Sequence, residues 1–120
     1  MRIFMMPLIA FGLISIDPPE EPSESAMRAA FEARLTAQVE NAMAFLAESS
    51  GAEAVERVRQ AGTDRFTVRE FTKRDCTKGE AGHVCAFAVD LTVVSGSIRQ
   101  TVTGRFAPGP DGRLTFTQES

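Results

Sequence analysis

The fold of this chain is decided by the stretch from Arg65 to Phe106, which reads RFTVREFTKRDCTKGEAGHVCAFAVDLTVVSGSIRQTVTGRF. Its fixed point is a pair of cysteines, Cys76 and Cys85, which flank a short polar loop. Apolar and polar residues alternate on both sides of that loop, and a period of two is typical of β-strands with one buried face. The stretch therefore predicts antiparallel strands that are covered on one side only.

Four strand-like runs follow one another from Arg65 onward. The second run carries its apolar residues at odd positions, and the third carries them at even positions. The second, third and fourth runs span residues 84–94, 98–106 and 113–117. Turn clusters rich in glycine and proline separate them at residues 95–97 and 108–112. This order predicts a four-stranded antiparallel meander.

The first run leaves one ambiguity. Phe66 and Val68 alternate as expected, but Phe71 falls on the opposite parity. A β-bulge near Arg69 and Glu70 restores the phase by inserting one residue, and we favour it. In the alternative, Phe71 covers the outer face and Glu70 points inward.

An amphipathic helix precedes the strands. Ser23 or Ser25 is placed to cap its free amide groups. Its apolar residues recur at steps of three or four and form one stripe that we expect to pack on the sheet: Met27, Phe31, Leu35, Val39, Met43 and Leu46. A capping box of Ser50 and Glu53 then predicts a second short helix that ends at Gly62.

The centre of the core should form where the helix stripe meets the longest strand. Phe31 lies within the stripe, and Phe87 lies on the apolar face of the strand run 84–94, two residues beyond Cys85. Because only one helix is long enough to cover the sheet, we expect these two rings to be in contact.

The N-terminal part divides into two segments before a single α+β domain at residues 23–120. Residues 1–16 are almost entirely apolar, with Arg2 near the start, and are too short to span a membrane. This composition favours a secretory signal, although an uncleaved anchor or an arm packed on the domain would look similar. Residues 17–22, DPPEEP, are typical of an extended tether that lies outside the folded core.

Composition limits the compartment and the partners. The chain has 120 residues, a net charge of −3 and a pI near 5.2, which argues against nucleic-acid binding. The acidic mature chain also lacks a basic surface for stable membrane association. The cysteine pair suits an oxidising compartment, so we expect a periplasmic or secreted protein with Cys76 and Cys85 joined in a disulfide.

A helix followed by a meander resembles the cystatin-like superfamily, which includes the nuclear-transport-factor-2-like domains. The runs 71–76, FTKRDC, and 82–85, GHVC, with the turn Asp111-Gly112, resemble small exported proteins of Gram-negative bacteria. Arg113 departs from that pattern, because an aromatic residue often follows the turn. The resemblance implies a disulfide between the first two strands and a helix–sheet cone. It implies no function, because inhibitors, binding modules and isomerases share this fold.

The residues offer little for catalysis or for a cofactor. Cys76, His83 and Cys85 would supply only three ligands for a metal, so we predict no metal site. We expect His83, the only histidine, to lie in the solvated loop. An isomerase-like site would need a carboxylate that points into the cone, and Glu70 and Asp90 are the only strand carboxylates that could do so. The position of Asp90 in the alternation places it on the outer face, and Glu70 points inward only if the bulge is absent.

The remaining prediction is a binding module without catalytic activity or cofactor. Its candidate face is the outer side of the sheet, for an unknown protein partner or a second copy, through Thr92, Arg99, Thr101, Thr103 and Arg105. The alternative is a small-molecule-binding or isomerase-like protein that uses the cone. An apolar cavity holding Glu70 would favour the alternative, and a filled core would favour the binding module.

Overall fold

The structure is a computed structural model that describes residues 20–119. The predictions for residues 1–16 and for the start of the tether lie outside the described residues. The elements are α1 (Glu24–Ser50), α2 (Ala52–Ala61), β2 (Phe66–Lys78), β3 (His83–Val93), β4 (Gly96–Pro108) and β5 (Leu114–Gln118). The four strands form one antiparallel sheet in the order β2-β3-β4-β5. The predicted α+β fold, with the helices N-terminal to a meander, is confirmed.

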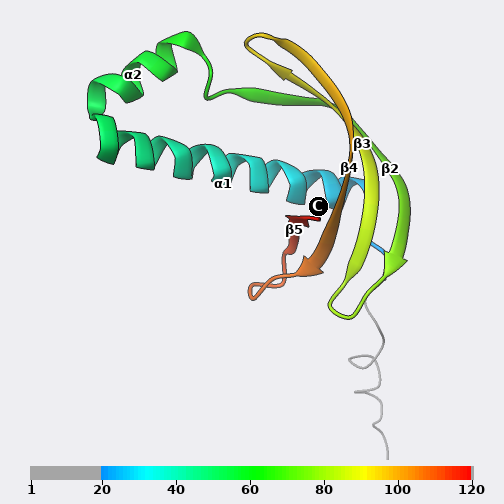
Figure 1. Cartoon of the computed structure of the whole chain (residues 1–120). Helices are drawn as coiled ribbons and strands as arrows, with labels where there is room; N and C mark the ends of the chain where they lie inside the picture. Colours follow the sequence, from blue (N-terminus) through cyan, green and yellow to red (C-terminus); the bar gives the residue numbers. More distant parts are fainter. Residues whose placement is uncertain (1–19, 120) are drawn as a thin grey trace, which may run out of the picture.

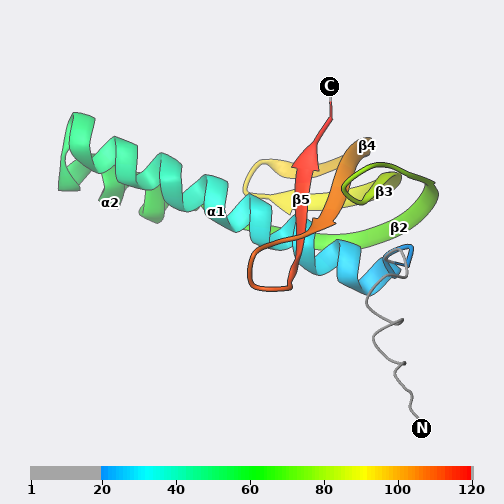
Figure 2. The same ribbon diagram turned by 90° about the horizontal axis from the view of Figure 1, so that it is seen from below.

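The sheet is strongly curved, and α1 lies against its concave side (Figure 1). Only the first half of α1 lies against the sheet. The second half extends past the strands, and α2 folds back beside it, as the view from below also shows (Figure 2). We call residues 36–61, which form this projection, the helical arm.

The predicted β-bulge is present in β2. The pairing with β3 shifts between Val68 and Glu70, so that Val68 and Phe71 both lie on the buried face, with exposed fractions of 3% and 6%. The bulge interrupts the ladder, and the Val68 carbonyl accepts a hydrogen bond from the Arg28 guanidinium of α1. A second shift in β2, between Lys73 and Cys76, was not predicted.

A cluster of five phenylalanine rings fills the space between α1 and the sheet. The Phe31 and Phe87 ring centroids lie 5.1 Å apart in an edge-to-face arrangement, which confirms the predicted contact. Phe71 stacks on Phe87 at 4.5 Å, and Phe106 and Phe116 complete the cluster. The core is therefore closed by aromatic packing around Phe87, which is fully buried.

The helix ends follow the predictions only in part. Ser23 caps α1 and accepts a hydrogen bond from the Ala26 N–H at 3.2 Å, as expected. The predicted capping box of Ser50 and Glu53 is wrong. Gly51 is the N-cap of α2 instead, and α2 has no side-chain hydrogen bond at its cap. The φ of 88° at Gly51, which favours glycine, lets the chain reverse between the two helices.

The far end of the sheet lacks a cover. Ile98 lies on the inner face opposite Leu91, as its parity predicted, yet it is 46% exposed. The turn beside it is Val94-Ser95, one residue earlier than predicted, since Val93 pairs with Gly96. Val94 is 61% exposed. Apolar side chains therefore reach solvent where α1 leaves the sheet.

Candidate functional site

The predicted outer face is a polar surface on the side of the sheet away from α1. Thr101, Thr103, Arg99 and Arg105 are exposed, and Thr92 is half-buried. The threonines of β4 lie opposite alanines of β3, with Thr101 across from Ala88. The structure therefore brings the five predicted residues onto one face.

The charges on that face largely pair with one another. Arg99 contacts the Asp90 carboxylate at 3.2 Å and the Glu70 carboxylate at 3.8 Å, and Arg105 lies 3.8 Å from Glu119. A hollow of about 150 Å³ lies beside Arg99 and these two strand carboxylates. The face offers alternating charges to a partner but little apolar area.

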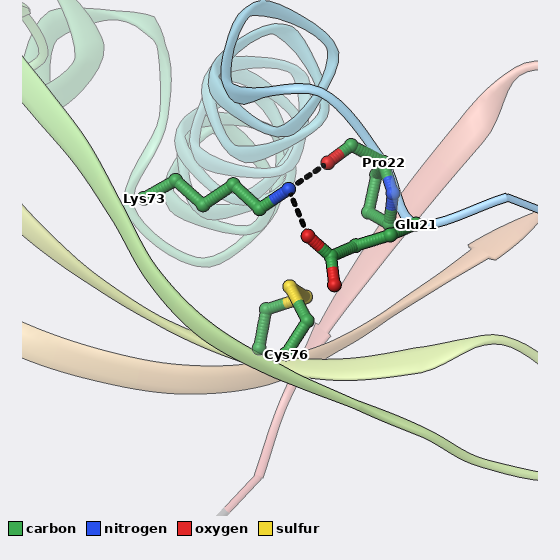
Figure 3. The surroundings of a disulfide bond; sticks show 5 residues. Glu21, Pro22, Lys73 and Cys76 are labelled. Atoms are coloured by element: carbon green, nitrogen blue, oxygen red, sulfur yellow. Dashed lines mark hydrogen bonds and ion pairs between the residues drawn. A yellow bond between two sulfur atoms is a disulfide. The ribbon is translucent and has the colours of Figure 1, made fainter.

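The disulfide predicted from the sequence joins Cys76 and Cys85, which are directly paired across β2 and β3. Beside it, the Lys73 ammonium group donates a hydrogen bond to the Pro22 carbonyl at 2.7 Å and pairs with the Glu21 carboxylate (Figure 3). The backbone N–H of Lys73 also donates a hydrogen bond to the Glu24 carboxylate at 2.9 Å. The last two residues before the domain are thus held against β2, and Pro22 is buried.

The expectation for His83 is wrong. His83 is the first residue of β3, only 7% exposed, and it pairs with Lys78 on one side and Phe106 on the other. The alternation that places Cys85 and Phe87 inward extends two residues further toward the N-terminus than we predicted. His83 therefore belongs to the buried face.

Within residues 20–119, the centre of the cone between α1 and the sheet is filled by aromatic side chains. The five phenylalanines of the cluster are each at most 6% exposed: Phe31, Phe71, Phe87, Phe106 and Phe116. The Glu70 side chain is 72% exposed and lies on the opposite face, because of the bulge. By the criterion set from the sequence, a filled core favours a binding module.

A hollow of the described surface lies beside the helical arm. This hollow and two neighbouring ones, of about 390, 310 and 290 Å³, share Val39 and Asp64 in their walls. Their apolar walls come from α1, α2 and the far end of the sheet: Leu35, Val39, Ala42, Met43, Phe45, Leu46, Val55, Val58, Phe66, Leu91 and Val93. We call this surface the distal groove.

The distal groove exists because the apolar stripe of α1 is longer than the sheet that covers it. Met27 and Phe31, in the first half, are 0% and 4% exposed. Val39, Met43 and Leu46, predicted as core, are only half-buried. Packing by α2 covers one side of this part of the stripe, and its other side stays open.

Phe45 is the residue that sequence reasoning missed. It is 71% exposed, more than any other large apolar side chain among residues 20–119. It follows Phe31 by 14 residues, which is close to four helical turns, so the two rings lie near the same side of α1. Continuing the stripe in heptads from Phe31 would have found it.

Asp64 is a charged residue within the mainly apolar walls of the distal groove. It lies in the turn between α2 and β2 and lines all three hollows. Its Oδ1 atom is buried and has no hydrogen-bond partner among residues 20–119. A buried carboxylate oxygen without a partner is costly in free energy.

Comparisons with family models, with curated proteins and with solved structures find no match for this chain. Within residues 20–119, no helix is long and apolar enough to cross a membrane. No group of three or more His, Cys, Asp or Glu side chains in the same part of the chain is arranged to hold a metal ion.

Proposed function

We propose that this chain is an exported binding module that holds a segment of another protein in the distal groove, without catalytic activity. The observation that carries the proposal is the partly open apolar stripe in the second half of α1, where Phe45 is 71% exposed. Exposed, contiguous apolar surface that is rimmed by polar residues marks interaction sites in soluble proteins.

Export is supported by the disulfide between Cys76 and Cys85. Disulfides persist in oxidising compartments such as the periplasm or the extracellular space and are rare in the cytosol. The apolar segment at residues 1–16 has the composition of a secretory signal.

A protein segment suits the groove better than a small molecule does. Small-molecule sites usually bury most of the surface of the ligand in a closed cavity. Here Ala42 and Phe45 are exposed along one wall, so the hollows open to solvent side by side. A long ligand can cover this wall, whereas a compact ligand would leave most of it in water.

The outer face of the sheet remains a second candidate, through Thr92, Arg99, Thr101, Thr103 and Arg105. The pairing of alanines with threonines favours contact with another sheet or a second copy. We rank it below the distal groove because Arg99 and Arg105 are already paired with carboxylates of this chain, and exposed ion pairs add little binding energy.

Site-specific photo-crosslinking in the cell that makes the protein tests the proposal. A photoreactive amino acid replaces Phe45 in one variant and Thr36 in the matched control. The two positions are nine residues apart, which places them on opposite sides of α1, and both are exposed. We expect a discrete adduct with one protein from position 45 and none from position 36. Equal labelling from both positions, or labelling from neither, would refute a specific site in the groove.

A further inference from the structure

We propose that the segment held in the distal groove is an amphipathic α-helix with one basic side chain that pairs with Asp64. This inference rests on the proposed function and names the chemistry of the partner. It follows from what the walls of the groove can and cannot offer to a bound chain.

The first step concerns the backbone of the occupant. The walls are formed mainly by aliphatic and aromatic side chains and by Ala42, which donate and accept no hydrogen bonds. An extended segment would lose water from its N–H and C=O groups there without replacing those hydrogen bonds, at a high cost. A helix satisfies its own backbone, so the apolar walls select a helix.

The second step concerns length. The half-buried part of the α1 stripe runs from Leu35 to Leu46, which is 11 residue steps, or about 16 Å of helix axis. A partner helix of three turns spans this distance. Residues spaced by three and four along one of its faces would meet Phe45 and the half-buried Val39.

The third step concerns charge. The Asp64 carboxylate lines all three hollows, and Glu40 adds a second carboxylate to one of them. Arg59 and Arg65 also line parts of the groove, but neither donates to Asp64 Oδ1. A lysine or arginine on the apolar face of the partner would pair with the Asp64 carboxylate in a charge-assisted hydrogen bond.

The test uses the full chain and two synthetic probes about four helical turns long. Both are amphipathic leucine- and alanine-rich helices with glutamate on the polar face. One carries lysine in the middle of its apolar face, and the other carries norleucine, which has the same alkyl chain without the ammonium group. Affinities are measured by isothermal titration calorimetry for the wild-type chain and for Asp64→Asn. We expect the lysine probe to bind the wild type at least ~10-fold more tightly, and Asp64→Asn to remove that preference, because the substitution removes the negative charge.

Further variants separate this inference from the proposed function. Phe45→Glu should weaken both probes at least ~10-fold, whereas Thr36→Glu, on the opposite side of α1, should weaken neither. Equal binding of both probes with no effect of Asp64→Asn would overturn the basic helix and leave the groove standing. Binding of neither probe, or no effect of Phe45→Glu, would overturn the groove itself. A proline-interrupted lysine probe that binds as well as the helical one would overturn the helical conformation.

Discussion

Replacing Phe31 by alanine should remove most of the stability of this domain, while the same change at Phe45 should leave stability intact. Both residues lie in α1, but Phe31 is 4% exposed and Phe45 is 71% exposed. The Phe31 ring lies 5.1 Å from Phe87, 5.5 Å from Phe116 and 6.0 Å from Phe71. Its removal leaves a cavity where the helix meets the centre of the sheet.

Loss of a buried phenylalanine ring costs about 3–5 kcal/mol, which is close to the whole free energy of unfolding of a small domain. Phe45→Ala loses no core contact, and alanine is the better helix former by a few tenths of a kcal/mol. We therefore expect Phe45→Ala to be neutral or slightly stabilising. The matched pair removes the same side chain from the same helix, so burial is the main difference between the two sites.

Urea melts of the two variants and of the wild type, followed by circular dichroism, check this expectation. The midpoint of Phe31→Ala should fall steeply, or the variant should be unfolded without urea, while Phe45→Ala should melt with the wild type. The packing described here is wrong if Phe31→Ala and Phe45→Ala have the same midpoint. It is equally wrong if Phe45→Ala is the more damaging change.

Three other predictions concern particular contacts. Replacing both cysteines by serine should lower the free energy of unfolding by about 2.5 kcal/mol for a sequence separation of 9 residues, measured by urea melts, and non-reducing mass spectrometry should find no free thiol in the native chain. Gly104→Ala should cost about 1–3 kcal/mol, because a Cβ atom there would overlap a ring carbon of Phe116; a melt unchanged from the wild type would contradict this packing. The hydrogen bond and charge of Lys73 lower the pKa of the Glu21 carboxyl, so the stability that this pair adds is present above the usual carboxyl pKa and is lost as the pH falls through the lowered value. An NMR titration should find the pKa of Glu21 below its usual range in the wild type and back within that range in Lys73→Met.

The alternation of apolar and polar residues was sufficient to predict the sheet, because each strand buries one face only. It also predicted the bulge in β2. Phe71 could be buried only if one residue was inserted after Val68, and the register shift lies at that point. The contact of Phe31 with Phe87 followed from the presence of one long helix and one oily sheet face. Local periodicity was enough wherever the partner surface was unique.

The parts that the sequence could not predict depend on lengths in three dimensions. The 27 residues of α1 span about 40 Å, and no periodicity states how much of that length the sheet will cover. Val39 and Met43 therefore looked like core and are half-buried. His83 was misplaced for a related reason, because a polar residue at the end of a strand gives no sign that the strand continues through it.

The helical arm is the part of the molecule whose stability depends most on what fills the distal groove. A helix gains most of its stability from tertiary packing, and an isolated helix shorter than about 12–15 residues is marginal in water. The first half of α1 has the phenylalanine cluster to pack on, whereas residues 36–50 have α2 and open space. A partner helix would supply the missing packing for Phe45, Leu46 and Val39, and its cation would pair with the Asp64 carboxylate. The contacts that would hold the partner are thus the same contacts that the arm lacks when it stands alone, so binding and ordering of the arm should be coupled.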